Sequence, residues 1–72
     1  MSKWIIIYPR GDRTRISTAE ICEGLEYEIN DYALASRQEF YEASDAYAYA
    51  RKLAKDNGKA YEGEAGEHDY LD

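Results

Sequence analysis

The hydrophobic pattern of the chain begins with an unbroken apolar run close to its first residue. Residues 3–8 read KWIIIY, a run of β-branched and aromatic side chains, and Pro9 and the turn-forming pair Gly11-Asp12 follow it. Such a run is typical of a strand, and the lack of alternating polar positions indicates burial on both faces. The sequence therefore predicts a central strand over residues 3–8.

A short helix is predicted after this strand, over residues 18–23. Ser17 and Glu20 have the S-x-x-E spacing of a capping box, in which the Ser hydroxyl accepts from one backbone amide and the Glu carboxylate from another. Gly24 fits the C-terminal end of such a helix, because a positive φ costs glycine little. Cys22 is expected to fill part of the core from this helix.

Two strands are predicted in the middle of the chain. Residues 25–30 read LEYEIN and alternate apolar with acidic side chains, which is the period of a strand with one face in water. Residues 36–42 form a weaker predicted strand that depends mainly on Phe40 and Tyr41.

The strongest helical pattern covers residues 44–57. Ser44 and Asp45 supply an N-terminal cap and a negative charge at the positive end of the helix dipole, and Asn57-Gly58 ends the helix. Six residues share one apolar face at helical spacing: Ala46, Tyr47, Tyr49, Ala50, Leu53 and Ala54.

The C-terminal residues complete a predicted α+β domain. A last short strand is expected over residues 59–62, and residues 63–72 contain too little apolar surface to pack, which predicts a mobile acidic tail. Residues 1–62 then form a single small domain with the split β-α-β-β-α-β order of ferredoxin-like folds. An alternative stays open, an N-terminal strand plus one long helix over about residues 32–57, because seven residues recur at alternating spacings of three and four: Ala33, Ser36, Phe40, Ala43, Tyr47, Ala50 and Ala54.

Charge is the part of the composition that bears most on function. The 72 residues carry 15 Asp+Glu against 9 Lys+Arg, a formal net charge of −6, and residues 16–50 hold eight acids against Arg37 alone. This balance disfavours a general nucleic-acid binder, because phosphate contacts require a surplus of Lys and Arg. No apolar run of roughly 18 residues is present, so no membrane span is expected. A single cysteine excludes an internal disulfide and favours a cytoplasmic location.

Motifs that carry chemistry are sparse. The tripeptide Arg10-Gly11-Asp12 matches an integrin-binding sequence, but a connecting turn is the preferred interpretation. Cys22 would need a neighbouring histidine to act as a nucleophile, and the single histidine, His68, lies in the predicted tail. The acids of residues 63–72 are not expected to be held in place as metal ligands must be. We therefore expect no enzyme activity, no cofactor and no metal.

The acidic block is the feature that points to a function. Like charges gathered over 35 residues repel one another, so the arrangement costs stability unless a positive surface binds there. Tyrosines lie among these acids, and Tyr is enriched in interface cores. The predicted partner-binding residues are Glu20, Glu23, Glu26, Tyr27, Glu28, Asp31, Tyr32, Glu39, Tyr41, Glu42 and Asp45.

In size, in its charge blocks and in its eight Tyr, the chain resembles small acidic inhibitors encoded by phages and mobile elements, such as anti-CRISPR and anti-restriction proteins that mimic DNA. The resemblance implies a non-enzymatic inhibitor, monomer or homodimer, that blocks a basic nucleic-acid-binding surface of a protein partner in a bacterial cytoplasm. Neither nucleic acid nor a membrane would be bound directly. The alternative is a small regulatory interaction module or homodimer, whose acidic face only keeps the chain soluble.

Overall fold

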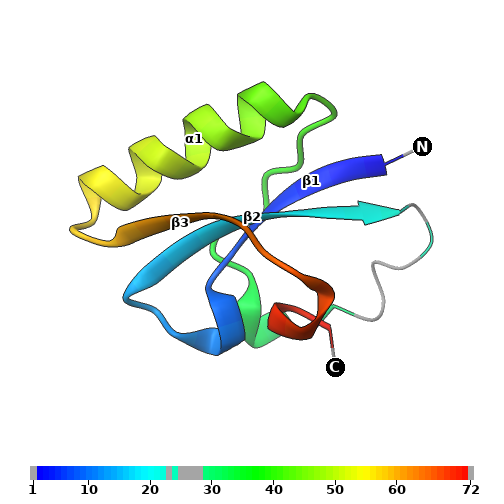
Figure 1. Cartoon of the computed structure of the whole chain (residues 1–72), viewed down its shortest axis with the longest axis horizontal. Coiled ribbons are helices and arrows are strands. Elements are labelled where there is room, and N and C mark those ends of the chain that lie inside the picture. The colour runs from blue at the N-terminus through cyan, green and yellow to red at the C-terminus, as the bar shows by residue number, and fades with distance from the viewer. Residues whose placement is uncertain (1, 23, 25–28, 72) are drawn as a thin grey trace.

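The computed structural model describes residues 2–22, 24 and 29–71, which form a small compact α+β unit. Its strands and helix are, in chain order, β1 (Ser2–Ile7), β2 (Arg15–Cys22), α1 (Ala43–Asp56) and β3 (Ala60–Glu64), with short 3₁₀ turns at Pro9–Gly11, Asp31–Ala33 and Glu67–Asp69. The three strands form one mixed sheet in the order β1-β2-β3, in which β1 and β2 are antiparallel and β2 and β3 are parallel. Helix α1 covers one face of this sheet (Figure 1).

The predicted first strand is confirmed, but its predicted central position is wrong. Strand β2 lies at the centre of the sheet, and β1 lies beside it. Residues 5–7 are nonetheless buried, as their unbroken apolar pattern indicated. The outer edge of β1 is bonded to an irregular segment: Trp4 N donates to Phe40 O at 2.7 Å, and Ala35 N donates to Ile6 O at 3.0 Å. This segment removes the free edge that would otherwise invite pairing with another chain.

The predicted helix over residues 18–23 is wrong, because residues 15–22 form strand β2. Their pairing with β1 runs from Ser2 opposite Cys22 to Ile7 opposite Ser17. Ser17 is buried, so its place in the sheet outweighs the local capping-box preference. With this strand in place of a helix, the ferredoxin-like split order is not confirmed.

The middle of the chain departs further from prediction. Of the predicted strand over residues 25–30, residues 25–28 lie outside the described part of the structure, and Ile29 forms an isolated bridge with Leu71. Residues 36–42 form no strand, only the single bridge between Phe40 and Trp4. The alternative long helix is also wrong, because helix α1 begins at residue 43 and the preceding residues follow the edge of β1 instead.

The predicted C-terminal helix and the strand after it are confirmed. Helix α1 packs through Ala46, Ala50 and Ala54, whose small side chains bring the helix close to the sheet. No side-chain hydrogen bond caps its first turn, and Glu42 rather than Ser44 is the N-cap residue. Strand β3 extends to Glu64 and carries an irregularity in its register with β2.

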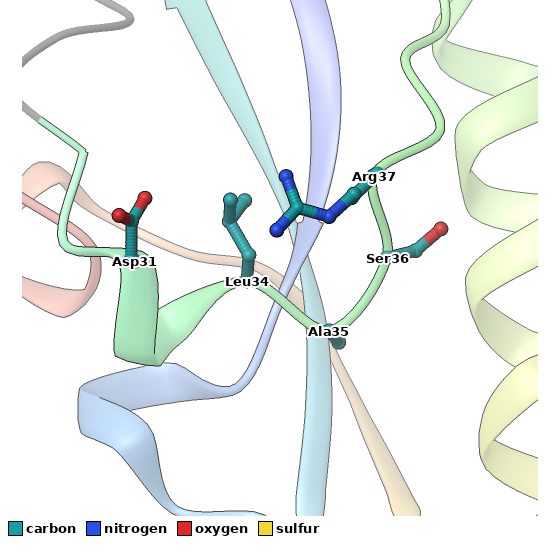
Figure 2. A pocket seen from close by; sticks show the side chains of 5 residues that line it. All are labelled: Asp31, Leu34, Ala35, Ser36 and Arg37. Atoms are coloured by element: carbon teal, nitrogen blue, oxygen red, sulfur yellow. The ribbon is translucent and has the colours of Figure 1, made fainter.

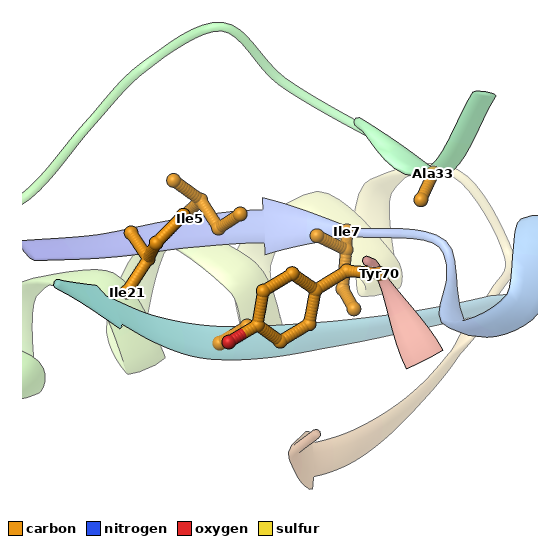
Figure 3. Close-up of a cluster of buried hydrophobic side chains, with 6 residues drawn as sticks. Ile5, Ile7, Ile21, Ala33 and Tyr70 are labelled. Atoms are coloured by element: carbon orange, nitrogen blue, oxygen red, sulfur yellow. The ribbon is translucent and has the colours of Figure 1, made fainter. Parts of the chain in front are cut away.

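The sheet is buried on both faces. On the helix side, Ile6 and Ile16 pack against the alanines of α1. On the opposite face a second cluster forms from Ile5, Ile7, Ala19, Ile21, Ala33 and Tyr70 (Figure 3). No helix among the described residues is long and apolar enough to cross a membrane.

The expected loose tail is not what the structure shows for residues 63–71. Tyr70 is only 4% exposed and inserts its ring into the second cluster, and Leu71 packs at its margin. A single buried aromatic ring removes a large apolar area from water, so even a polar, glycine-containing segment can be anchored by one such residue. The packed domain therefore extends at least to residue 71.

Candidate functional site

The structure describes seven of the eleven predicted partner-binding residues. Glu23, Glu26, Tyr27 and Glu28 lie outside the described part of the chain. The others are placed as follows: Glu20 on β2, Asp31 and Tyr32 in the 3₁₀ turn after residue 30, and Glu39, Tyr41, Glu42 and Asp45 around the start of α1.

Five of these seven residues gather at one end of the molecule. Trp4 faces Glu20 across the β1–β2 pair and bridges Phe40 on its other side, so Glu20 and the residues flanking Phe40 lie at the same level of the sheet. Helix α1 begins above this end, where β1 starts and β2 finishes (Figure 1). Asp31 and Tyr32 do not join them, because their turn leads into the segment that packs on the opposite face of the sheet.

Glu64, which sequence reasoning assigned to a tail, lies on β3 between this end and the hollow that Arg10 and Arg15 line, and we group it with the acidic residues because it is close to Glu20. It pairs with Thr18 across the parallel strands, two positions before Glu20 on β2. Half-buried Tyr47 on α1 lies close to both Glu64 and Glu20. Burial raises the pKa of the Tyr47 hydroxyl most, and the negative charges of Glu64 and Glu20 raise it further. Only the parallel pairing of β2 and β3 reveals this neighbourhood, and that pairing has no local sequence signal. We name the set Glu20, Glu39, Tyr41, Glu42, Asp45 and Glu64 the acidic end.

Four of the five carboxylates of the acidic end have no ion pair among the described residues, whereas four of the six other described acids have one and Asp31 and Glu67 have none. Glu39 alone is paired, to Lys3 at 2.7 Å. Glu20, Glu42, Asp45 and Glu64 are exposed, and no cation among residues 2–22 and 29–71 pairs with them. Elsewhere four acids are paired: Asp12 and Glu62 with Arg15, Asp56 with Lys52, and Asp69 with Arg10. Negative charge is thus left uncompensated at one end of the molecule.

An exposed aromatic ring accompanies this charge. Tyr41 is 63% exposed and directly precedes Glu42 at the start of α1. Tyr32 is exposed to 78% on its own turn, away from the acidic end. Most of the other described tyrosines are at least partly buried, as Tyr49 is against the ring of Phe40 at 5.2 Å between centroids. Tyr41 therefore offers contact area that the fold itself does not use.

Part of this charge also serves the fold. Asp45 lies in the first turn of α1, where a carboxylate interacts favourably with the positive end of the helix dipole. Lys55 lies in the last turn, at the negative end. Stabilisation of the helix accounts for Asp45, but it does not account for Glu20 and Glu64, which lie on strands.

Two cationic residues lie at the opposite end, around the ring of Tyr8. The Arg13 guanidinium carbon and the Lys59 Nζ each lie 5.3 Å from the centroid of this ring. Lys59 also donates to the Arg13 carbonyl oxygen, which joins the N-terminal loop to the residues after α1.

The Arg10-Gly11-Asp12 sequence forms a closed turn. Asp12 Oδ1 accepts from Thr14 N at 3.0 Å and from Thr14 Oγ1 at 2.7 Å, and Oδ2 accepts from Arg15 Nε at 2.9 Å. These hydrogen bonds, those from Thr14 above all, hold the pKa of Asp12 below its ordinary value of 3.8. Arg10 meanwhile donates from Nε to Asp69 at 3.0 Å. Both charged members of the tripeptide are thus engaged within the fold.

No arrangement for covalent or metal chemistry appears among the described residues. Cys22 is exposed at the end of β2, so the expectation that it fills the core is wrong. His68 lies in the turn Glu67–Asp69, and its Nε2 is 3.5 Å from Asp69 Oδ1. Within the described ranges no three His, Cys, Asp or Glu side chains are grouped to hold a metal ion.

A comparison with protein-family models finds no matching family, and comparisons with curated proteins and with solved structures likewise find no match. The functional interpretation therefore depends on the residues and their geometry.

Proposed function

We propose that this chain is a non-enzymatic inhibitor whose acidic end binds the basic nucleic-acid-binding surface of a protein partner. Its carboxylates would occupy positions that phosphates occupy on nucleic acid, which is the manner of anti-CRISPR and anti-restriction proteins. The chain performs no chemistry in this role, and its action is to exclude nucleic acid from the partner.

The observation that supports the proposal most is the group of unpaired carboxylates beside an exposed ring. Glu20, Glu42 and Glu64 are exposed without cationic partners among the described residues, while four of the six described acids outside the acidic end are paired. Uncompensated like charges repel, and a cationic partner surface relieves this repulsion. Tyr41 adds a ring of the type that frequently anchors interfaces.

A second candidate function rests on a different observation, the open edge of β3. Within the described residues no strand pairs beyond β3, so its outer backbone groups are available for strand addition by a partner or a second copy. Glu62 and Glu64 are exposed along this five-residue strand, and short, charged strands are a common protection of sheet edges against pairing. The open edge of β3 is therefore weaker support for an interaction module than the acidic end is for an inhibitor.

Affinity capture followed by competition tests the proposal. The full-length chain is used to recover partners from a bacterial lysate, and the recovered complex is then challenged with duplex DNA and with RNA. The proposal predicts a nucleic-acid-binding protein that nucleic acid displaces from the chain. Recovery of a partner that neither nucleic acid displaces would contradict it.

Charge-neutralising variants assign the binding to the acidic end. The triple variant Glu20→Gln, Glu42→Gln and Asp45→Asn removes three negative charges with little change in shape. The matched control, Asp56→Asn, Glu62→Gln and Glu67→Gln, removes the same number of charges from other parts of the surface. We expect the first triple variant to lose the partner and the control to retain it, whereas a strand-edge module would tolerate the first variant.

A further inference from the structure

A hollow that the proposed function does not use lies beside the segment that follows β1 along its edge. It has a volume of about 340 Å³ and is lined by Asp31, Leu34, Ala35, Ser36 and Arg37 (Figure 2). A second hollow of about 180 Å³ shares Leu34, Ser36 and Arg37 with the first and continues over Ile5 and Ile29. Arg37 thus borders two adjoining hollows, of which the second is lined by the apolar Ile5 and Ile29 and also by Gln38 and Glu39, whose carboxylate pairs with Lys3.

Arg37 is the only basic residue between residues 16 and 50, and it is not neutralised within the described structure. Its guanidinium points across the hollow toward Leu34, and the Asp31 carboxylate stands on the far side of that leucine (Figure 2). Although both line one hollow, the two groups form no ion pair, and Arg37 pairs with no other acid among the described residues. A positive and a negative group therefore face one space with an apolar residue between them.

The backbone that carries these groups is held in place from both sides. Ahead of Asp31, the side chain of Asn30 accepts from Tyr32 N at 3.0 Å and fixes the 3₁₀ turn. Leu34 bridges Ile7 of β1, and Ala35 N donates to Ile6 O at 3.0 Å. The two charged positions are therefore set by the edge of the sheet and not by a free loop, which lowers the cost of ordering them around a ligand.

The Arg37 end of the segment is fixed in the same way. Ser36 Oγ accepts from Gln38 N at 3.1 Å, and it lies 3.3 Å from Tyr49 Oη on helix α1. Ser36 points toward the helix in Figure 2, away from the hollow, so its hydroxyl serves to anchor the segment. The side chains left to contact a ligand are those of Arg37, Asp31 and Leu34.

From this geometry we propose that the hollow binds a small zwitterion, a molecule with a carboxylate at one end, an ammonium at the other and an apolar body between. The carboxylate accepts from the Arg37 guanidinium, whose planar donors match two carboxylate oxygens. The ammonium pairs with Asp31, and the apolar body lies on Leu34 and extends toward Ile29. A ligand with only one charge satisfies only one side of the hollow.

Three ligands of nearly equal size test this proposal on the full chain. Aminocaproate carries both charges, caproate carries only the carboxylate, and hexylamine carries only the ammonium. In titrations followed by amide NMR spectra, we expect aminocaproate to bind about tenfold more tightly than either of the others, since each charged hydrogen bond is worth roughly that factor. The perturbed amides should be those of residues 31–37.

Two variants separate the contributions of the charged groups. Arg37→Gln should reduce the affinity for aminocaproate to that for hexylamine, and Asp31→Asn should reduce it to that for caproate. Arg51→Gln and Glu67→Gln alter exposed charges elsewhere and should change no affinity. Equal affinities for the three ligands, or an aminocaproate affinity insensitive to both Arg37→Gln and Asp31→Asn, would overturn the proposal. The dispersion of the same spectra shows that each variant is folded.

Discussion

The Tyr70 hydroxyl donates a hydrogen bond to the Glu20 carbonyl oxygen at 2.9 Å, which joins the end of the chain to its central strand across 50 residues of sequence. Glu20 is thereby shared by two features. Its carbonyl oxygen accepts the hydrogen bond from Tyr70, whose ring covers one face of the sheet, and its side chain belongs to the acidic end. The C-terminal segment therefore supports the strand on which the candidate interaction surface is built.

Removal of the Tyr70 ring should destabilise the domain severely. Because Tyr70 is 4% exposed within an apolar cluster, Tyr70→Ala should lower the free energy of unfolding by about 3–5 kcal/mol, the range seen for large aromatic deletions. Tyr70→Phe, which removes only the hydrogen bond to Glu20, should cost about 1 kcal/mol. Urea denaturation measures both. The control is Tyr32→Ala at an exposed position, which should change the free energy of unfolding by less than about 0.5 kcal/mol. If Tyr70→Ala had an effect as small as this control, the C-terminal segment would not pack as described.

Thr18 offers a stabilising substitution. It is fully buried on β2, and its Oγ1 has no hydrogen-bond partner among the described residues. Thr18→Val keeps the shape of the side chain and removes a polar group that lost its hydration on folding, so we expect a gain of about 1 kcal/mol in unfolding free energy. Thr18→Ser keeps the hydroxyl and deletes a methyl group, and it should destabilise. A loss of stability in Thr18→Val would indicate that the hydroxyl is satisfied in solution.

The ion pair between Lys3 and Glu39 should contribute more to the free energy of unfolding than a fully exposed ion pair does. The Lys3 side chain is only 10% exposed, whereas that of Glu39 is 44% exposed, and their charged atoms are 2.7 Å apart. Glu39→Gln removes a negative charge that lies 2.7 Å from a largely buried ammonium, and we expect a loss of about 1–2 kcal/mol in chemical denaturation. Asp56→Asn disrupts the exposed pair with Lys52 and serves as the control, with an expected loss below about 0.5 kcal/mol. Equal effects of the two changes would refute this ranking.

Acid should weaken the turn that Asp12 organises. The hydrogen bonds from Thr14 lower the pKa of Asp12 in the folded state below its ordinary value of 3.8. The carboxylate then contributes stability that is present above the ordinary pKa and is lost as pH falls through the lower, folded value. Thr14→Val removes the side-chain donor, so its melting temperature should fall less on acidification than that of the unaltered chain. Parallel curves for the two proteins would contradict the assignment.

How far the sequence predicts this structure depends on whether the signal is local. The apolar run of residues 3–8 and the helical spacing of residues 44–57 are both local, and the strand and helix they predict are present. The capping-box spacing at Ser17 is local too, yet it was misleading, because burial between two covered faces decides the conformation of β2. Sequence-distant burial also explains the C-terminal segment, which one aromatic residue anchors.

The residues of the candidate site also divide into those that local sequence signals place and those that only contacts between distant residues bring together. Glu42 and Asp45 are close in sequence, and their shared position at the start of α1 follows from the predicted helix. Glu64 joins them only through the parallel pairing of β2 with β3 around the intervening helix. Asp31 and Tyr32, although inside the acidic block, are directed elsewhere by the turn that leads to the second face of the sheet. A run of acidic residues in the sequence therefore does not by itself show that their side chains share one surface of the folded chain.

The affinity of the chain for its captured partner, measured at rising salt concentration, tests the proposed function most directly. Contacts between exposed carboxylates and a basic surface are screened by salt, so we expect binding to weaken steeply. The variant with Glu20→Gln, Glu42→Gln and Asp45→Asn should bind weakly at low salt and show a shallower dependence, while the matched control variant should follow the unaltered chain. An affinity that is the same at low and high salt, and unchanged by neutralising the acidic end, would contradict the proposal.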